Sequence, residues 1–370
     1  MKYVLWLLRI VVGVLFIFSG LVKANDPLGL SYKMMEFFEV WHMPSLIAYS
    51  LPLSILMIAF EIIAGVALLL GFAQRIFSML LLLLITFFTF LTAYVLFSGK
   101  IKECGCFGDC IKITNTETFY KDVALLVMAV VLYIFRKRIK PVFSGYPSLA
   151  LMVLTVFFAF GIQWWVLEHL PFYDCLPYKI GNNLYEKSQL PPGAQPPVFE
   201  TVLTYEKDGV KKEFDMQNIP WQDSTWKFVD SKTKLIKEGT GEAEIKDFKL
   251  SDYEGNDHTD EVLKAPGYVF LFFVRDVNKA RTDHLDRLKQ LLDEAEAKNI
   301  PTYILSSSDQ PSTMAFLQKW NLTKFNLLVV DNTASKTGMR TNPGLMLLNN
   351  GTVVNKWSFR DYPKNMQWHN

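Results

Sequence analysis

The 370-residue sequence contains little of what most enzyme sites are built from. Its four cysteines are too few for a disulfide-stapled scaffold, although they suffice for one thiol site. Its five histidines are scattered without metal-ligand spacing, so we predict no metal site built on histidine. Neither a glycine-rich phosphate loop nor a Gly-x-Ser-x-Gly turn occurs. The formal net charge is +2, and no basic stripe with interleaved aromatic residues is present, so we expect no nucleic-acid partner.

Hydrophobic residues are abundant, at 51% of the chain, and they concentrate in its first half. Five runs approach the roughly 20 apolar residues that carry a helix across a bilayer. They are residues 3–22, 50–70, 76–97, 122–135 with its flanks, and 149–167. The first run is long for a signal peptide and contains Arg9, so we expect an uncleaved anchor. The sequence therefore predicts a multi-pass helical membrane protein in contact with lipid.

Basic residues in the short loops predict the orientation of these helices. One loop between predicted spans carries Arg75, and another carries Arg136, Lys137, Arg138 and Lys140. Such loops remain on the cytoplasmic side of a membrane, which also makes the N-terminus cytoplasmic. Everything after about residue 168 then faces outward. We expect a bacterial inner-membrane protein whose C-terminal domain lies in the periplasm, an oxidising compartment.

All four cysteines fall on the side predicted to face outward. Cys104, Cys106 and Cys110 lie between the third and fourth runs, and Cys175 follows the last run. Gly105 permits a sharp bend between Cys104 and Cys106. A disulfide across so short a gap would be strained, and strained disulfides exchange readily.

Three interpretations of these cysteines remain open. In the first, Cys104 and Cys106 are catalytic thiols that exchange disulfides, and Cys110 or Cys175 is a resolving thiol. In the second, a structural disulfide ties the loop to Cys175. In the third, four thiolates bind zinc, although Cys-x-Cys spacing is tight and an oxidising compartment works against free thiolates.

The first two predicted spans each contain a charged residue. Arg9 is in the first and Glu61 is in the second, where an isolated charge is costly. Because these two helices run antiparallel, we expect Arg9 and Glu61 at comparable depths and forming an intramembrane pair. A polar pocket for a quinone or a proton is the alternative interpretation.

The composition changes after the fifth run. Prolines at 191–197 predict a stiff linker. Residues 199–205 and 211–214 predict a hairpin, and residues 226–229 and 234–236 predict a second strand pair. From about residue 245 the pattern predicts alternating strands and helices, as in a compact α/β domain. These elements are a strand at 268–274, a helix at 282–298, a strand at 302–305, a helix at 312–320 capped by Ser312, a strand or buried turn at 326–330, and a hairpin of 344–348 with 352–357.

The membrane half resembles a known family. Residues 8–16, 19–23 and 61–65 resemble the DoxX family, and Cys104-Gly105-Cys106-Phe107-Gly108 resembles the related methylamine-utilisation protein MauE. The resemblance covers about residues 1–140 and implies a four-helix membrane bundle. For MauE it also implies a part in forming disulfides while a partner enzyme matures, with Cys104 and Cys106 as the thiols.

Residues 245–360 resemble the thioredoxin-like fold. The strand at 268–274 stands where that fold presents Cys-x-x-Cys, and Asn342-Pro343 matches its cis-proline. Residues 275–281 occupy the active-site position and contain no cysteine, so a thiol relay inside this domain is excluded. Without these cysteines, the resemblance implies a scaffold domain whose edge beside Pro343 can dock a peptide.

We therefore predict an α-helical transmembrane bundle, DoxX-like with a fifth span, followed by an α/β thioredoxin-like domain. The expected parts are a bundle at 1–140, a fifth helix and exit at 141–175, a linker and strand-rich region at 176–244, and the tail at 245–370. Our first hypothesis is a membrane-anchored thiol-disulfide oxidoreductase that acts on an exported client and uses a membrane quinone as electron acceptor. The alternative is a non-enzymatic assembly subunit that has a structural disulfide and binds a membrane partner subunit.

Overall fold

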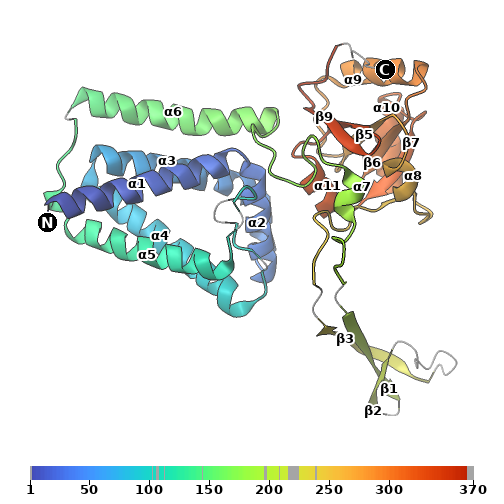
Figure 1. The fold of residues 1–370 in the computed structure, drawn as a ribbon, viewed down its shortest axis with the longest axis horizontal. Helices are drawn as coiled ribbons and strands as arrows, with labels where there is room; N and C mark the ends of the chain where they lie inside the picture. The colour runs from blue at the N-terminus through green and yellow to red at the C-terminus, as the bar shows by residue number, and fades with distance from the viewer. Residues whose placement is uncertain are drawn as a thin grey trace.

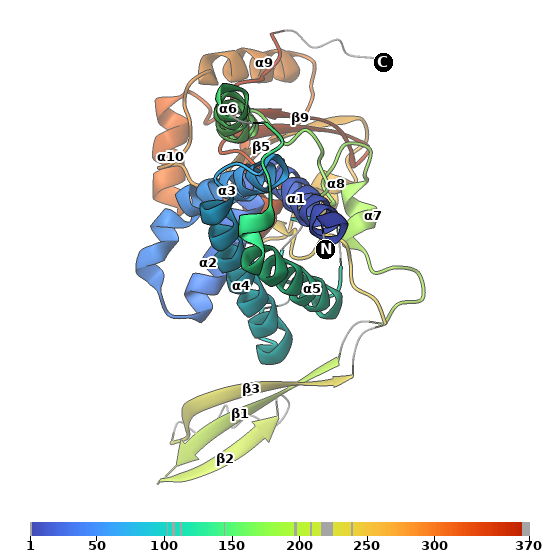
Figure 2. The same ribbon diagram turned by 90° about the vertical axis from the view of Figure 1, so that its left-hand side faces the viewer.

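The protein has three parts, a helical bundle, an α/β tail domain beyond one end of the bundle, and a three-stranded arm that projects from the tail (Figures 1 and 2). The computed structural model describes residues 2–101, 103–105, 108–111, 113–143, 145–195, 198–207, 209–215, 225–237 and 240–364. Cys106 lies outside the described residues.

Five long helices run along the bundle, and a short helix lies across the end that faces the tail domain (Figure 1). The long helices are α1 (Lys2–Ala24), α3 (Ser50–Leu70), α4 (Gln74–Ser98), α5 (Asn115–Ile134) and α6 (Tyr146–Glu168). The crossing helix is α2 (Pro27–Val40), and two 3₁₀ turns are η1 (Pro44–Tyr49) and η2 (Arg136–Arg138). Because α2 covers this end, the bundle meets the tail domain through α2 and the neighbouring loops.

Four helical segments are long and apolar enough to cross a membrane. They are Lys2–Ala24, Pro44–Leu70, Gln74–Ser98 and Tyr146–Glu168. This confirms a multi-pass membrane protein. The fourth predicted run forms α5, which carries Lys121 and Asp122 and is not one of these segments, so a fifth crossing remains a prediction.

Helices α1 and α3 approach each other closely through glycines. A Cβ atom on Gly13 would lie 2.6 Å from a side-chain carbon of Leu69, and one on Gly65 would lie 2.8 Å from the carbonyl oxygen of Gly13. Small residues let membrane helices pack with their backbones in contact. The bundle core forms beside this contact from Val12, Phe16 and their buried neighbours.

The tail domain is a six-stranded mixed sheet with the order β4-β7-β6-β5-β8-β9. Strands β5, β6 and β7 are parallel, whereas β8 is antiparallel to β5. The strands are β4 (Leu250–Ser251), β5 (Tyr268–Val274), β6 (Thr302–Ser306), β7 (Asn326–Val330), β8 (Gly344–Asn349) and β9 (Thr352–Ser358). The helices are α7 (Leu184–Ser188), α8 (Thr259–Leu263), α9 (Leu285–Ala297), α10 (Gln310–Lys319) and α11 (Asn332–Gly338).

This domain confirms the predicted alternation of strands and helices in an α/β domain. Strand β5 lies centrally and is buried on both sides, as its unbroken apolar run predicts. The Asn342–Pro343 peptide bond is cis. The predicted cap of α10 was wrong, because Asp309 rather than Ser312 is the N-cap, and its carboxylate accepts a bond from the Ser312 backbone N–H at 2.9 Å.

The arm is a separate sheet of β1 (Val198–Lys207), β2 (Val210–Asp215) and β3 (Lys227–Lys237), in the order β2-β1-β3. The predicted hairpin is confirmed as β1 and β2. The predicted second pair was wrong, because residues 227–237 form one strand that pairs with β1. The ring of Phe228 packs on Tyr205 of β1, with centroids 5.7 Å apart, so its partner is β1 rather than the second half of its own strand.

The core of the tail domain also includes residues that precede the arm. Tyr178 and Leu184 are fully buried in the cluster that contains Phe248 and Leu250. The arm therefore emerges from within the tail domain, between α7 and β4, rather than linking the bundle to the tail.

Candidate functional site

A disulfide joins the bundle loop to the segment that enters the tail domain. Cys110, in the loop between α4 and α5, is bonded to Cys175, which follows α6, and their Cα atoms are 4.8 Å apart. These two cysteines were predicted as resolving or structural thiols, and the structure brings them together. Because the bond uses two of the four thiols, it removes the four-thiolate zinc interpretation.

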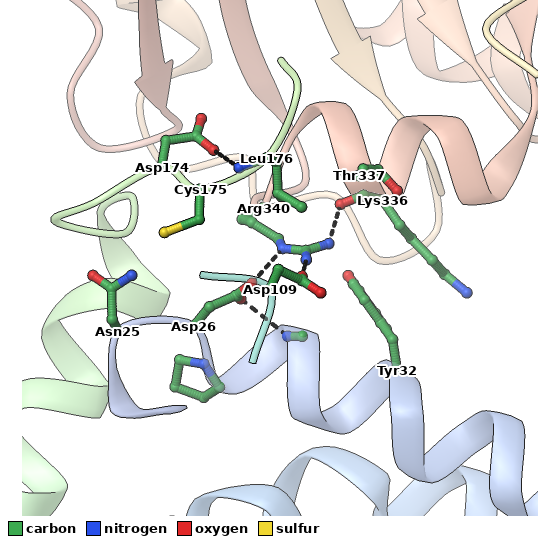
Figure 3. A network of polar contacts seen from close by, with 12 residues as sticks. Asn25, Asp26, Tyr32, Asp109, Asp174, Cys175, Leu176, Lys336, Thr337 and Arg340 are labelled. Atoms are coloured by element: carbon green, nitrogen blue, oxygen red, sulfur yellow. Dashed lines mark hydrogen bonds and ion pairs between the residues drawn. The ribbon is translucent and has the colours of Figure 1, made fainter. Parts of the chain in front are cut away.

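Each cysteine of this disulfide follows an aspartate that pairs with a cation of the tail domain. Asp109 accepts a bond from Arg340 at 2.7 Å, as Figure 3 shows. Asp174 accepts one from Lys356 at 2.6 Å. Both cations are buried, with 6–7% of each side chain exposed. The disulfide and the two ion pairs therefore hold the tail domain at the same place, beside the cysteine loop of the bundle.

Arg340 also reaches the bundle itself. Its Nε donates to Asp26 at 2.8 Å, at the turn between α1 and α2 (Figure 3). Burial alone would lower the pKa of Arg340, but the carboxylates of Asp26 and Asp109 outweigh it and raise that pKa. Burial lowers the pKa of Lys356, which Asp174 only partly offsets. The positive charges of Arg340 and Lys356 are therefore buried and are compensated by neighbouring carboxylates.

Tyr32 of α2 is the centre of a second contact with the tail domain. Arg275 donates to its hydroxyl at 3.1 Å. Lys336 and Arg340 lie 5.0 and 5.3 Å from the centre of its ring, within the range of cation–π attraction. An aromatic ring surrounded by three cations anchors this side of the tail domain to α2.

The edge of the tail domain that was predicted to dock a peptide faces the bundle. Pro343 is buried, and the loop before it carries Arg340. Asn342 donates to the carbonyl of Asp276 at 2.7 Å and so links this loop to the segment after β5. Of the residues just before Pro343, Arg340 therefore contacts the bundle, whereas Asn342 contacts the tail domain itself.

Cys104 is half-buried at the boundary between two cavities. It packs against an apolar cluster that includes Phe37, Val95 and Ile101. The polar cavity, about 270 Å³, is lined by Cys104, Cys175 and residues of the bundle loop and the tail domain. The apolar cavity, also about 270 Å³, is lined by residues of the bundle.

The apolar cavity is enclosed by α2, η1, α3 and α4. Aromatic side chains dominate its lining, together with Leu and Met, and Lys23 contributes a cation. The aromatic lining residues are Phe37, Phe38, Trp41, Phe87 and Phe88. The lining can therefore accept a flat, apolar molecule that carries at least one hydrogen-bond acceptor.

The predicted intramembrane pair of Arg9 and Glu61 was wrong. Arg9 donates instead to the backbone carbonyls of Leu68 at 2.7 Å and of Leu69, at the end of α3. Glu61 lies seven residues earlier on α3, about 10 Å away at 1.5 Å per residue. The last carbonyls of a helix lack intrahelical partners and carry partial negative charge, so they attract Arg9.

Glu61 pairs with Lys23 of α1 instead. Their side-chain atoms lie 2.5 Å apart, and both residues are buried. Ser19 donates to the same carboxylate at 3.0 Å. Sequence reasoning missed Lys23 as the partner of Glu61, although a lysine that ends a long apolar run was a usable signal.

Among the residues described, no group of three or more His, Cys, Asp and Glu side chains is arranged to hold a metal ion. Sequence reasoning also missed Arg340 and the two aspartates. The repeated dipeptide Asp-Cys, at residues 109–110 and 174–175, was the available signal.

Comparison with known proteins supports the membrane half of the prediction. The family model described as methylamine utilisation protein MauE matches residues 1–135, and a domain of unknown function (DUF8463) matches residues 199–238, which correspond to the arm. A search of curated proteins found no significant match.

Similar solved structures include reduced Prx3 from Vibrio vulnificus, alone and in complex with hydrogen peroxide. Each is 20% identical, with a TM-score of 0.26 over 33% of this chain and 87% or 88% of that one. Similarity at this level assigns no family to the tail domain, whose architecture is given by its own strand order. Residues 1–135, which contain α1 to α5, are similar to the MauE family of membrane proteins.

Proposed function

We propose that this chain is a membrane-anchored thiol-disulfide oxidoreductase that forms disulfides in an exported client through Cys104 and Cys106. One observation carries the proposal: Cys104 and the Cys110–Cys175 disulfide line the same polar cavity beneath the tail domain. A redox-active cysteine beside a structural disulfide, in a polar cavity at the bundle end, suits exchange with a protein client.

The chemistry balances as dithiol–disulfide exchange. A client thiolate attacks the Cys104–Cys106 disulfide and forms a mixed disulfide, and one sulfur of the chain leaves as thiolate. The second client thiol then displaces the chain, so the client gains a disulfide and the chain holds two thiols. Gly105 has a backbone φ of 70°, a conformation that glycine adopts without strain and that suits the bend between the two cysteines.

The Cys110–Cys175 disulfide has a structural role in this proposal. Its flanking aspartates bind buried cations of the tail domain, which favours a fixed clamp over an exchanging pair. The same observation, together with a tail active-site segment that lacks cysteine, favours the second candidate function. That candidate is a non-enzymatic assembly subunit that binds an exported or membrane partner.

The proposed topology has five crossings, with a cytoplasmic N-terminus in a bacterial inner membrane and a periplasmic tail. The disulfide holds the α4–α5 loop and the end of α6 on one side. If α6 crosses the membrane, α5 must cross as well to reach the start of α6. Asp122 of α5 is 2% exposed and lines a small cavity with Glu61 and Lys23, so its charge faces the bundle rather than lipid.

Basic residues support this orientation. Arg75 lies at the start of α4 and η2 follows the end of α5, so both are at the bundle end opposite the cysteine loop that joins these helices. The preference of basic loops for the cytoplasm makes this the inner end. The tail acts as a thioredoxin-like scaffold above the cysteine loop. In this proposal a client peptide docks at the edge beside Pro343, three residues after the contact between Arg340 and Asp26.

Trapping of mixed disulfides tests the proposal in intact cells. The Cys106→Ala variant leaves Cys104 without its partner, so we expect covalent adducts with exported proteins on non-reducing gels. The double variant Cys104→Ala/Cys106→Ala should form none, and Cys110→Ala/Cys175→Ala should still exchange. If Cys106→Ala forms no adduct and client disulfides are unchanged in the double variant, the assembly-subunit function is favoured instead.

A further inference from the structure

The apolar cavity lies between helices of the bundle and is only partly closed. Leu53 of α3 and Phe87 of α4 line it, and 39% and 41% of these residues are exposed. Both helices are among the segments apolar enough to cross a membrane. A molecule dissolved in the bilayer can therefore enter between them, whereas a water-soluble ligand would have to cross apolar surface.

Two lysines lie in the wall of this largely apolar cavity, Lys23 and Lys33, and Lys33 pairs with Glu36 at 3.1 Å. Lys23 lines it, and its ammonium group donates to Glu61 at 2.5 Å and to Ser19 at 3.1 Å. An ammonium has three N–H donors, and among the described residues these two partners accept two of them. Lys23 also lies 4.8 Å from the ring centre of Phe88, in the same cavity wall.

Cys104 lies at the wall of the same cavity. It is therefore accessible from the apolar cavity on one side and from the polar cavity on the other. A thiol that must be reoxidised after each client needs a two-electron acceptor. The apolar cavity lies beside Cys104, between helices that are apolar enough to cross a membrane.

We propose that the apolar cavity binds an isoprenoid quinone, with its head group between Lys23 and Cys104 and its tail in the bilayer between α3 and α4. This inference rests on the proposed function and names its electron acceptor. Ligand pockets typically enclose roughly 300–1,000 Å³, so a cavity of about 270 Å³ suits a single substituted ring whose tail lies outside. The five aromatic side chains provide faces on which such a ring stacks.

The redox step balances without another reactant. Two thiols of the chain lose two electrons and two protons and become a disulfide. The quinone gains both and becomes a quinol, with a new O–H bond on each oxygen. Hydrogen bonding from Lys23 to one quinone oxygen stabilises the negative charge that develops there as electrons arrive from sulfur.

Photolabelling of the full-length protein in lipid nanodiscs tests the site. The probe is an azido-ubiquinone analogue, and mass spectrometry locates the labelled residues. Leu91 lines the cavity, so Leu91→Trp should fill it and reduce labelling of α2 and α4 at least tenfold. Leu83 is on the same helix with 59% of its surface exposed, so Leu83→Trp is the matched control and should label as the wild type does.

A second measurement separates this inference from the proposed function. Decylubiquinone reduction by the pre-reduced protein, followed by absorbance, should be lost in Cys104→Ser and in Leu91→Trp, but Cys104→Ser should keep wild-type photolabelling. Equal labelling of Leu91→Trp and wild type, or labels confined to the outer faces of the helices, would overturn the quinone site. Specific labelling without any client adduct would leave the site standing and refute only the client reaction.

Discussion

Arg340 lies 2.7 Å from Asp109, the residue directly before Cys110, and so holds the tail domain at the cysteine loop. The other half of the disulfide repeats this arrangement, because Lys356 lies 2.6 Å from Asp174, directly before Cys175. The disulfide therefore connects two Asp-Cys pairs, each bound by a buried cation of the tail. Loss of any one of these contacts should loosen the tail at the same place.

The first prediction concerns the disulfide. The double variant Cys110→Ser/Cys175→Ser should lower the free energy of unfolding by about 2–4 kcal/mol, the usual contribution of a disulfide. Hydrogen exchange should accelerate in residues 169–182, which are tied to the bundle by this bond, and should change little in β5. Cys104→Ser is the control, and equal acceleration in that variant would contradict a specific role for the Cys110–Cys175 bond.

The second prediction concerns Arg340. Removing one partner of a buried ion pair leaves the other charge uncompensated, at a cost of about 3–5 kcal/mol, and the partial exposure of Asp109 should keep the loss near the lower end. Arg340→Met should therefore lower the thermal unfolding midpoint. Arg340→Lys should fall in between, because one ammonium cannot replace a guanidinium that reaches both Asp26 and Asp109.

The matched control for Arg340 is Arg281, which also joins the tail to the bundle. It pairs with Glu168 at 3.1 Å, but 46% of its side chain is exposed. An exposed pair contributes about 0–1 kcal/mol, so Arg281→Met should change the unfolding midpoint little. If both variants lose the same stability, burial is not what makes Arg340 important.

The third prediction is a pH dependence in the tail domain. Hydrogen bonds from His258 to Glu261 and Asp252 raise the pKa of this imidazole above its usual value of 6.5. A pKa that is higher in the folded than in the unfolded protein means that the stabilisation is complete below pH 6.5 and is lost as the pH rises through the folded value. NMR titration of the histidine ring should show this raised midpoint.

Two variants check the origin of that shift. Glu261→Gln should lower the His258 midpoint toward 6.5, because it removes the larger cause. His258→Gln should remove the corresponding loss of stability as the pH rises above 6.5. A His258 midpoint that does not move in Glu261→Gln would contradict the assignment.

Elements whose signal is local were predictable from the sequence. The spans follow from apolar length, β5 from an unbroken apolar run, and the β8–β9 hairpin from Asn350-Gly351, both of which adopt positive φ. The arm was misjudged because strand pairing is a tertiary choice. The sequence of residues 227–237 contains no signal that identifies β1 as the strand with which they pair.

The position of the cysteines in the candidate site could be predicted from the sequence, but the pairing of its charged residues could not. Clustering of the cysteines pointed to the loop that contains Cys104, and chain order placed Cys175 on the same side. The pairing of Arg9 with Glu61 failed because depth in a bundle depends on how helices slide along each other. The close contact of Gly13 with Gly65 fixes that register and brings Lys23 opposite Glu61.

The last prediction concerns this buried pair. Lys23→Met leaves the Glu61 carboxylate without its counter-charge in the bundle, so unfolding in mixed micelles should show a loss of about 3–5 kcal/mol. Replacing both residues removes both charges, and the double variant Lys23→Met/Glu61→Met should recover most of that loss, because apolar residues often replace a buried pair at no net cost. Lys33→Met, at a lining lysine with 26% of its side chain exposed, is the control and should be nearly neutral. Additive effects of the two single substitutions would mean that Lys23 and Glu61 do not interact, and the quinone site would then lack the fixed cation that orients its head group.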